Sequence, residues 1–97
     1  MKIDMSLKNE KLYEDCQLEE VGGCLSLITP PDQAANLVGR NMQVIVDGLL
    51  PEERRDVTLT GPMAVWAYLI VFHIVVHKFG KVWYDDGRGN VVQIAQH

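Results

Sequence analysis

The sequence predicts one α/β domain, residues 1–97, that combines a partly parallel sheet with two helices. Between residues 30 and 49, apolar side chains recur every three or four positions, which is the spacing of one buried helix face. Residues 57–60 and 81–85 are short β-branched and aromatic runs, and an almost wholly apolar segment, 63–79, lies between them. A strand–helix–strand unit with a right-handed crossover makes its two strands parallel. The C-terminal hairpin adds an antiparallel strand, so we expect a mixed sheet.

Composition places the chain among ordinary globular proteins. It has 97 residues, of which 47% are hydrophobic and 23% charged, and its formal net charge is −4. A general nucleic-acid coat needs a basic face, so we expect no DNA partner. The chain has two cysteines, and its first 15 residues lack the apolar run of a secretory signal. We therefore expect reduced thiols and a cytoplasmic protein.

The N-terminal third is weakly patterned. Residues 1–15 are polar with three alternating apolar side chains, so they are expected to form an edge strand or a loose arm. Residues 16–21 and 24–28 are typical of two short strands. Gly22-Gly23 between them predicts a hairpin turn.

The first helix has recognisable start and stop signals. Thr29 is the expected N-cap and Pro30 the first helical residue, and the helix is expected to end at Gly48 or Leu50. The buried stripe is expected to comprise Ala34, Leu37, Val38, Met42, Ile45 and Leu49. Residues 52–56 are expected to form a solvated loop.

The second helix is expected to open with Gly61-Pro62, to span residues 63–79 and to end at Gly80. It is apolar nearly all round, which predicts cover on more than one side. Its uninterrupted apolar part is about 14 residues, fewer than the roughly 20 that cross a bilayer. We expect a core helix and no membrane partner. The chain then closes with a hairpin, strands 81–85 and 91–95 around a tight turn.

Chemistry-bearing side chains gather in the last third of the chain. His73 and His77 are four residues apart and share one helix face, a spacing that suits metal ligation. The segment lacks the glutamate of a zinc-protease motif, and two histidines on an apolar helix more often pack or cap than catalyse. Both interpretations stay open on these residues alone.

Further candidates flank this helix. Asp85 and Arg88 belong either to a solvated hairpin turn or to a carboxylate metal ligand with a phosphate clamp. Thr60 and Gly61 precede a helix N-terminus, a natural anion site. His97 ends the sequence.

Strand geometry separates these candidates. In a regular hairpin Asp85 lies at the turn, whereas His97 and His77 lie near the opposite end, about 13 Å away at roughly 3.3 Å per residue. A complete site would therefore need either a bent hairpin or two copies of the chain.

The order of the segments resembles a known family. LTGP (59–62), an apolar helix with His73 and His77, then Gly80 and VWYD (82–85) are similar to the small CRISPR-associated ring nucleases of type III systems, the Csx-type family that cleaves cyclic tetraadenylate. The likeness covers about forty residues. The turn departs from the family's Asp-Pro-Arg pattern, because Asp-Gly stands between the matched aspartate and arginine.

This resemblance implies a reduced Rossmann-like, CARF-like fold and manganese-dependent phosphodiester cleavage that ends antiviral signalling. By position, His77, Asp85 and Arg88 match catalytic residues, and His77, Asp85 and His97 match metal-associated ones. The implied ligand contacts are Thr60, Gly61, His73 and Arg88.

The resemblance also implies partners. They are cyclic tetraadenylate or short RNA and a second copy of the chain, with dimers that stack on the ligand into tetramers or filaments. The altered turn leaves two alternatives: a module that senses or sequesters the ligand without cleaving it, and a structural subunit.

Overall fold

A computed structural model describes residues 1–96 and contains two α-helices and six strands over that range. In chain order the elements are β1 (Lys2–Asp4), β2 (Leu18–Val21), β3 (Cys24–Leu27), α1 (Pro31–Asp47), the 3-10 turn η1 (Pro51–Glu53), β4 (Asp56–Thr60), α2 (Val65–Val75), β5 (Lys81–Asp85) and β6 (Val91–Gln96). The expected small α/β domain with a mixed sheet, two helices and a C-terminal hairpin is confirmed.

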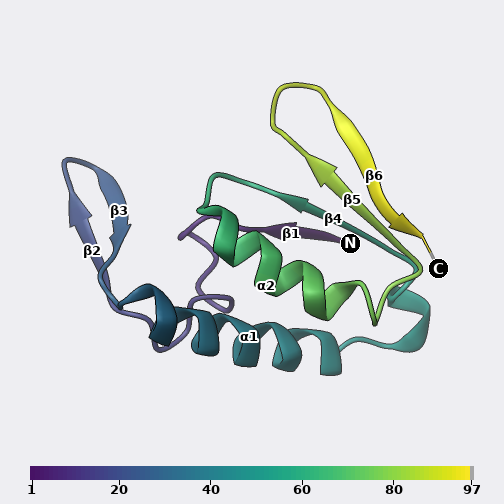
Figure 1. Cartoon of the computed structure of the whole chain (residues 1–97), viewed down its shortest axis with the longest axis horizontal. Coiled ribbons are helices and arrows are strands. Elements are labelled where there is room, and N and C mark those ends of the chain that lie inside the picture. The colour runs from purple at the N-terminus through teal and green to yellow at the C-terminus, as the bar shows by residue number, and fades with distance from the viewer. Residues whose placement is uncertain (97) are drawn as a thin grey trace.

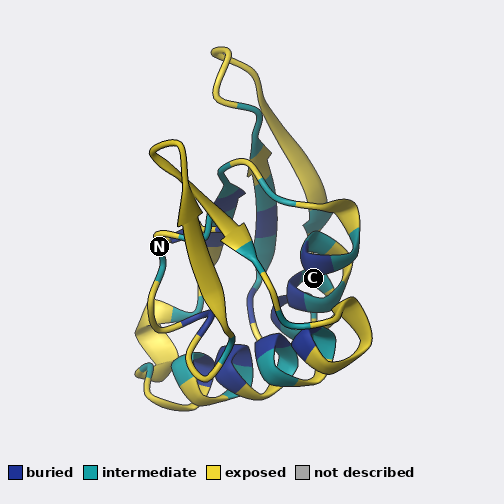
Figure 2. Ribbon diagram, turned by 90° about the vertical axis from the view of Figure 1, so that its left-hand side faces the viewer, coloured by how far each residue is buried: buried dark blue, intermediate teal, exposed yellow. Residues whose placement is uncertain are grey.

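The main sheet has the order β1-β4-β5-β6. Strands β1, β4 and β5 are parallel, and β6 returns antiparallel to β5. Both helices lie on one side of this sheet and pack against each other (Figures 1 and 2). The molecule therefore has two layers, whereas a doubly wound fold has helices on both faces of its sheet.

Alternation along the strands sorts side chains between the two faces of the sheet. The face beneath the helices buries Ile3, Val57, Leu59 and Val82. Lys2, Thr58 and Trp83 lie in one register row on the opposite face. That opposite face carries no helix and is mostly polar.

Helix α1 starts one residue later than expected. Pro30 is its N-cap and Pro31 its first residue, and Gly48 is its C-cap as expected. Thr29 does not cap the helix, because its Oγ1 accepts a hydrogen bond from the Gln17 N–H at 2.7 Å.

The buried stripe of α1 differs from the expected one. Its fully covered residues are Ala34, Val38, Asn41, Met42 and Val46, while Leu37, Ile45 and Leu49 are half-buried. Asn41 is only 4% exposed. Its amide nitrogen donates to the carbonyls of Leu12 and Glu14, both at 2.9 Å. Asn41 thus ties the segment that follows β1 to the helix layer.

Helix α2 is shorter than expected, Val65–Val75 rather than residues 63–79. Gly61 and Pro62 therefore do not open the helix directly, because a short linker separates them from Val65. The expected cover on more than one side is incomplete, because Val65 is 72% and Leu69 62% exposed. The helix rests on the sheet and on α1, and its remaining face meets solvent.

The β2–β3 hairpin forms a separate two-stranded sheet that projects from the rest of the molecule (Figure 1). Nearly all its side chains are exposed (Figure 2). The sequence allowed either an edge strand or a loose arm at the N-terminus. The structure has an edge strand there, β1.

Residues 52–56 are exposed as expected, except that Arg54 is half-buried. One guanidinium nitrogen of Arg54 donates to the carbonyls of Val46 at 3.0 Å and Leu49 at 3.2 Å. Arg54 thereby caps the C-terminal end of α1, where a cation is favoured. Within residues 1–96, neither helix has the length and apolar character needed to cross a membrane.

Candidate functional site at the carboxyl ends of the parallel strands

Three strand ends meet at one edge of the sheet. The register pairs Asp4 of β1 with Thr60 of β4, and Thr60 with Asp85 of β5. In open α/β sheets ligands bind outside the carboxyl ends of parallel strands. The structure therefore brings two of the sequence-predicted residues, Thr60 and Asp85, to the edge where such sites form.

The two aspartates at this edge have different surroundings. The carboxylate of Asp4 accepts hydrogen bonds from the Ser6 N–H at 2.8 Å and the Ser6 hydroxyl at 2.9 Å. Asp85 accepts from the Gly87 N–H at 2.9 Å, and its other oxygen lies 3.9 Å from the ammonium of Lys2. Asp4 is thus committed to a local turn, whereas Asp85 retains an oxygen that faces an exposed cation.

Gly61 allows the close approach of this edge to the turn after β1. Its φ is +109°, and a Cβ at this position would lie 2.6 Å from the Asp4 Oδ1 and 3.1 Å from the Ser6 nitrogen. Only glycine adopts such a backbone without strain. The structure therefore gives Gly61 a structural role, and its role as a ligand contact stays a prediction.

Tyr68 of α2 is a member of this edge that sequence reasoning missed. Its hydroxyl donates to the carbonyl of Gly61, and its ring packs edge-on against Tyr84 with centroids 5.5 Å apart. Burial, reinforced by Tyr84 and by the carboxylates of Asp4 and Asp85, raises the pKa of Tyr68 to about 12. The sequence offers no signal for this role, because Tyr68 is one more aromatic residue of an apolar helix.

The turn after Asp85 is built around Asp86. Its carboxylate accepts from the backbone N–H of Arg88 at 2.7 Å, and from the side-chain amide of Asn90 at 2.9 Å. These hydrogen bonds, that from Asn90 first, lower the pKa of Asp86 below its usual value. Arg88 is exposed at this turn and makes no ion pair within residues 1–96.

The histidines lie elsewhere. His73 is on α2, and His77 follows the helix in a turn rather than in the helix as expected. Their rings meet edge-on with centroids 5.5 Å apart, and both are exposed. The two side chains meet as the spacing predicts, but they do not share a helix face, because the helix ends at Val75.

One chain does not unite the histidines with Asp85. His77 lies in the turn four residues before β5 begins, and Asp85 ends that strand, which is about 13 Å long at roughly 3.3 Å per residue. Within residues 1–96, no three or more His, Cys, Asp or Glu side chains are grouped to hold a metal ion. The metal set His77, Asp85 and His97 is therefore not assembled by the described residues, and His97 lies outside them.

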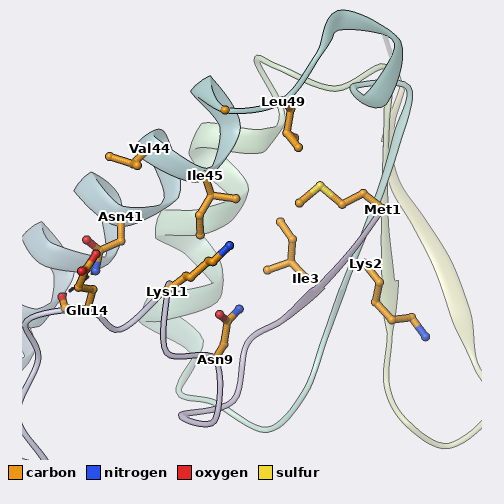
Figure 3. A pocket seen from close by; sticks show the side chains of 11 residues that line it. Met1, Lys2, Ile3, Asn9, Lys11, Glu14, Asn41, Val44, Ile45 and Leu49 are labelled. Atoms are coloured by element: carbon orange, nitrogen blue, oxygen red, sulfur yellow. Dashed lines mark hydrogen bonds between the residues drawn. The ribbon is translucent and has the colours of Figure 1, made fainter.

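A hollow in the described part of the chain lies away from this edge. It has a volume of about 660 Å³ and lies between β1, residues 9–14 and α1 (Figure 3). It contains none of the sequence-predicted site residues.

Comparison with protein-family models, with curated proteins and with solved structures finds no match to this chain. The functional argument therefore depends on the residues and their geometry.

Proposed function

We propose that this protein is a ring nuclease that binds cyclic tetraadenylate and cleaves its phosphodiester bonds, in the manner of the Csx-type family that the sequence resembles. The observation that supports this most directly is the placement of Thr60 and Asp85 side by side at the carboxyl ends of β4 and β5. The glycine bend at Gly61 follows at once, and the exposed Arg88 lies three residues beyond Asp85. A polar strand end, a glycine bend and an exposed cation suit a phosphate-bearing ligand.

The proposed roles follow from the chemistry of each group. Arg88 neutralises phosphate charge, and Thr60 and Gly61 contact the sugar-phosphate backbone. Asp85 orients the reacting groups, and His77 accepts or supplies a proton, work that suits an exposed imidazole. His73 supports His77 through the ring contact at 5.5 Å.

The proposed reaction needs two copies of the chain. His77 precedes β5 and Asp85 ends it, and the strand is about 13 Å long, so we infer that one copy offers each reacting bond only some of these groups. The manganese that the resemblance implies does not fit the residues of one copy either, because they form no group of three ligands within residues 1–96. A homodimer in which His77 of one copy serves Asp85 of the other answers the first point, and a cyclic fourfold ligand suits its two-fold axis.

The β6 edge is a surface through which we propose that copies of the chain associate. Pairing there leaves three strand spacings, roughly 14 Å, between β5 of one copy and β5 of the other, so the shared site also needs copies that face each other. Strand β6 is the longest strand of the sheet, it carries no charge, and Val91, Val92 and Ile94 are each half exposed or more. Exposed edges of this kind are templates for pairing. The opposite edge, β1, is only three residues long and carries Lys2 and Asp4. A bulge beside Ile94 limits the pairing to the segments on either side of it.

A non-catalytic binding module is the second candidate. Its supporting observation is the turn at Asp86, which is closed by its own hydrogen bonds and spaces Arg88 one residue further from Asp85 than the family pattern does. Such a module would be stabilised by the ligand without cleaving it.

The test is cleavage of labelled cyclic tetraadenylate with manganese present. We expect linear product from the wild-type protein and a rate lower by a factor of about 10² or more in His77→Ala and Asp85→Ala, the usual share of one acid–base group. Glu20→Ala, on the projecting β2–β3 hairpin, is the matched control and should cleave normally. Ligand-dependent thermal stabilisation without product would favour the binding module. Neither product nor stabilisation would reject both candidates.

Mixing the two inactive variants tests the shared site. In a mixed dimer one of the two sites keeps both His77 and Asp85, so the mixture should regain about a quarter of the wild-type rate. If the mixture stays inactive while the wild type cleaves, the site lies within one copy and the two-copy arrangement is wrong.

A further inference from the structure

The hollow between β1 and α1 is a second place where the fold can hold a ligand. Its volume of about 660 Å³ lies within the roughly 300–1,000 Å³ of small-molecule sites. It lies between the second half of α1, the start of the chain with β1, and residues 9–14. Neither Asp85 nor His77 lines the hollow, so this proposal does not rest on the proposed nuclease function.

The floor of the hollow is apolar. Met1 and Ile3 line it from β1, and Val44, Ile45 and Leu49 line it from α1 (Figure 3). Val44 is 66% exposed, so apolar surface continues to the rim. A ligand with a hydrocarbon chain would remove this surface from water, which is favourable in proportion to its area.

The wall formed by residues 9–14 is held in place. The side chain of Asn9 donates to the Asp4 carbonyl at 2.8 Å and accepts from the Leu12 N–H at 3.3 Å. Asn41 binds the carbonyls of Leu12 and Glu14. Both amides are therefore occupied by the protein itself, and they preserve the shape of the hollow rather than offering hydrogen bonds to a ligand.

Lys11 is the cation available to a ligand at this place. Its ammonium reaches over the apolar floor between Ile3 and Ile45 (Figure 3), and within residues 1–96 it has neither an ion pair nor a hydrogen bond. Lys2, the other lysine of the lining, extends away and lies 3.9 Å from Asp85. Glu14 is the single acid of the lining and lies at the far end, beside Asn41.

We propose that this hollow binds an amphipathic monoanion, a carboxylate on a medium-length hydrocarbon chain. The chain covers Met1, Ile3, Ile45 and Leu49, and the carboxylate pairs with the Lys11 ammonium. The charge argument selects this class: in a protein of net charge −4 the unpaired cation stands above an apolar floor, so the complement is an anion with an apolar body.

Decanoate is the probe, titrated into isotopically labelled protein and followed by NMR. The amide signals of Ile3, Ile45 and Leu49 should move together. Decanol, which has the same chain without the charge, should bind about tenfold more weakly, as expected when a charge-assisted hydrogen bond is lost. Decyltrimethylammonium should bind more weakly still.

Substitutions separate the charge from the floor. Lys11→Gln should weaken decanoate about tenfold and leave decanol unchanged, whereas Lys8→Gln, the matched control on the preceding turn, should change neither. Glu14→Gln should strengthen decanoate, and Ile45→Gln should weaken both probes. The proposal is overturned if decanoate and decanol bind alike, if Lys11→Gln has no effect, or if the shifts lie on the β2–β3 hairpin.

Discussion

Single residues at the strand ends do two kinds of work. Gly61 gives the backbone room beside Asp4, and Tyr68 closes the same corner by donating its hydroxyl to the Gly61 carbonyl. Neither role is visible in the sequence, where Gly61 marks a helix start and Tyr68 a helix interior. Both depend on β1 and β4 lying side by side, a contact between residues more than fifty positions apart.

The phenol of Tyr68 should make the free energy of unfolding fall at alkaline pH. Its pKa is raised to about 12 in the folded state, against about 10 in an unfolded chain. Below pH 10 the phenol is protonated in both states, so its contribution is complete. Between about pH 10 and 12 the unfolded state loses the proton first, and the free energy of unfolding should fall.

The variant Tyr68→Phe tests this expectation. At pH 7 it should lose about 1 kcal/mol of unfolding free energy with the hydrogen bond to Gly61. Between pH 10 and 12 its stability should fall less steeply than that of the wild type, as measured by urea unfolding. Tyr13 also has a raised pKa but is present in both proteins, so it cancels. Equal slopes would contradict the assignment.

Elements of this fold differ in how far they depend on the core. Helix α1 and strands β4 and β5 bury whole side chains, and Arg54 and Asn41 tie α1 to the neighbouring segments. The β2–β3 hairpin does the opposite, since it projects with nearly every side chain exposed. A lone two-stranded hairpin is marginal in water, so it adds little to the stability of the domain.

Replacing residues 18–27 with Asn-Gly should leave the domain folded. Gln17 and Ile28 already face each other, because the Ile28 N–H donates to the Gln17 carbonyl at 2.8 Å, and a two-residue turn can join them. We expect the melting temperature to change by less than about 4 °C, the shift that accompanies roughly 1 kcal/mol in a domain of this size.

A core variant provides the scale for this measurement. Met42 is fully buried, and Met42→Ala should cost about 2–5 kcal/mol. If the loss of the hairpin lowered the melting temperature as much as Met42→Ala does, the hairpin would have to pack on the domain, contrary to its exposure.

The whole molecule presents surfaces that a single copy leaves unsatisfied. The sheet has a charge-free edge at β6, and α2 exposes Val65 and Leu69. One copy also does not bring His77 to Asp85. These two observations together are the physical reason to expect a second copy. A single half-exposed aliphatic side chain is common on a protein surface. Several of them on one edge indicate a surface for association.

The substitution Ile94→Lys tests the dimer. We expect the wild-type protein to have twice the mass of one chain by light scattering, and Ile94→Lys to have the mass of one, because a charge on an edge strand opposes pairing. Val44→Lys, at an exposed position of α1, is the control and should stay dimeric. A monomeric wild type would remove both the proposed interface and the shared site.

Local patterning predicted most of the elements. The helix over residues 30–49, the strand 81–85, the tight turn 86–90 and the Gly22-Gly23 hairpin were all predicted from spacing and turn chemistry, and each is present within one or two residues. The ends of α2 were wrong, because an apolar run does not distinguish helix from the linker and turn that flank it.

The composition and order of the sequence therefore determined the class of this protein: one α/β domain with two helices and a closing hairpin. Only the tertiary structure decided which side chains meet. It placed Asp4, Thr60 and Asp85 in one row, brought Tyr68 to Gly61, and put His77 in the turn before β5 while Asp85 ends that strand. Strand order and register are set by packing between segments far apart in the chain, and a local pattern carries no record of that packing.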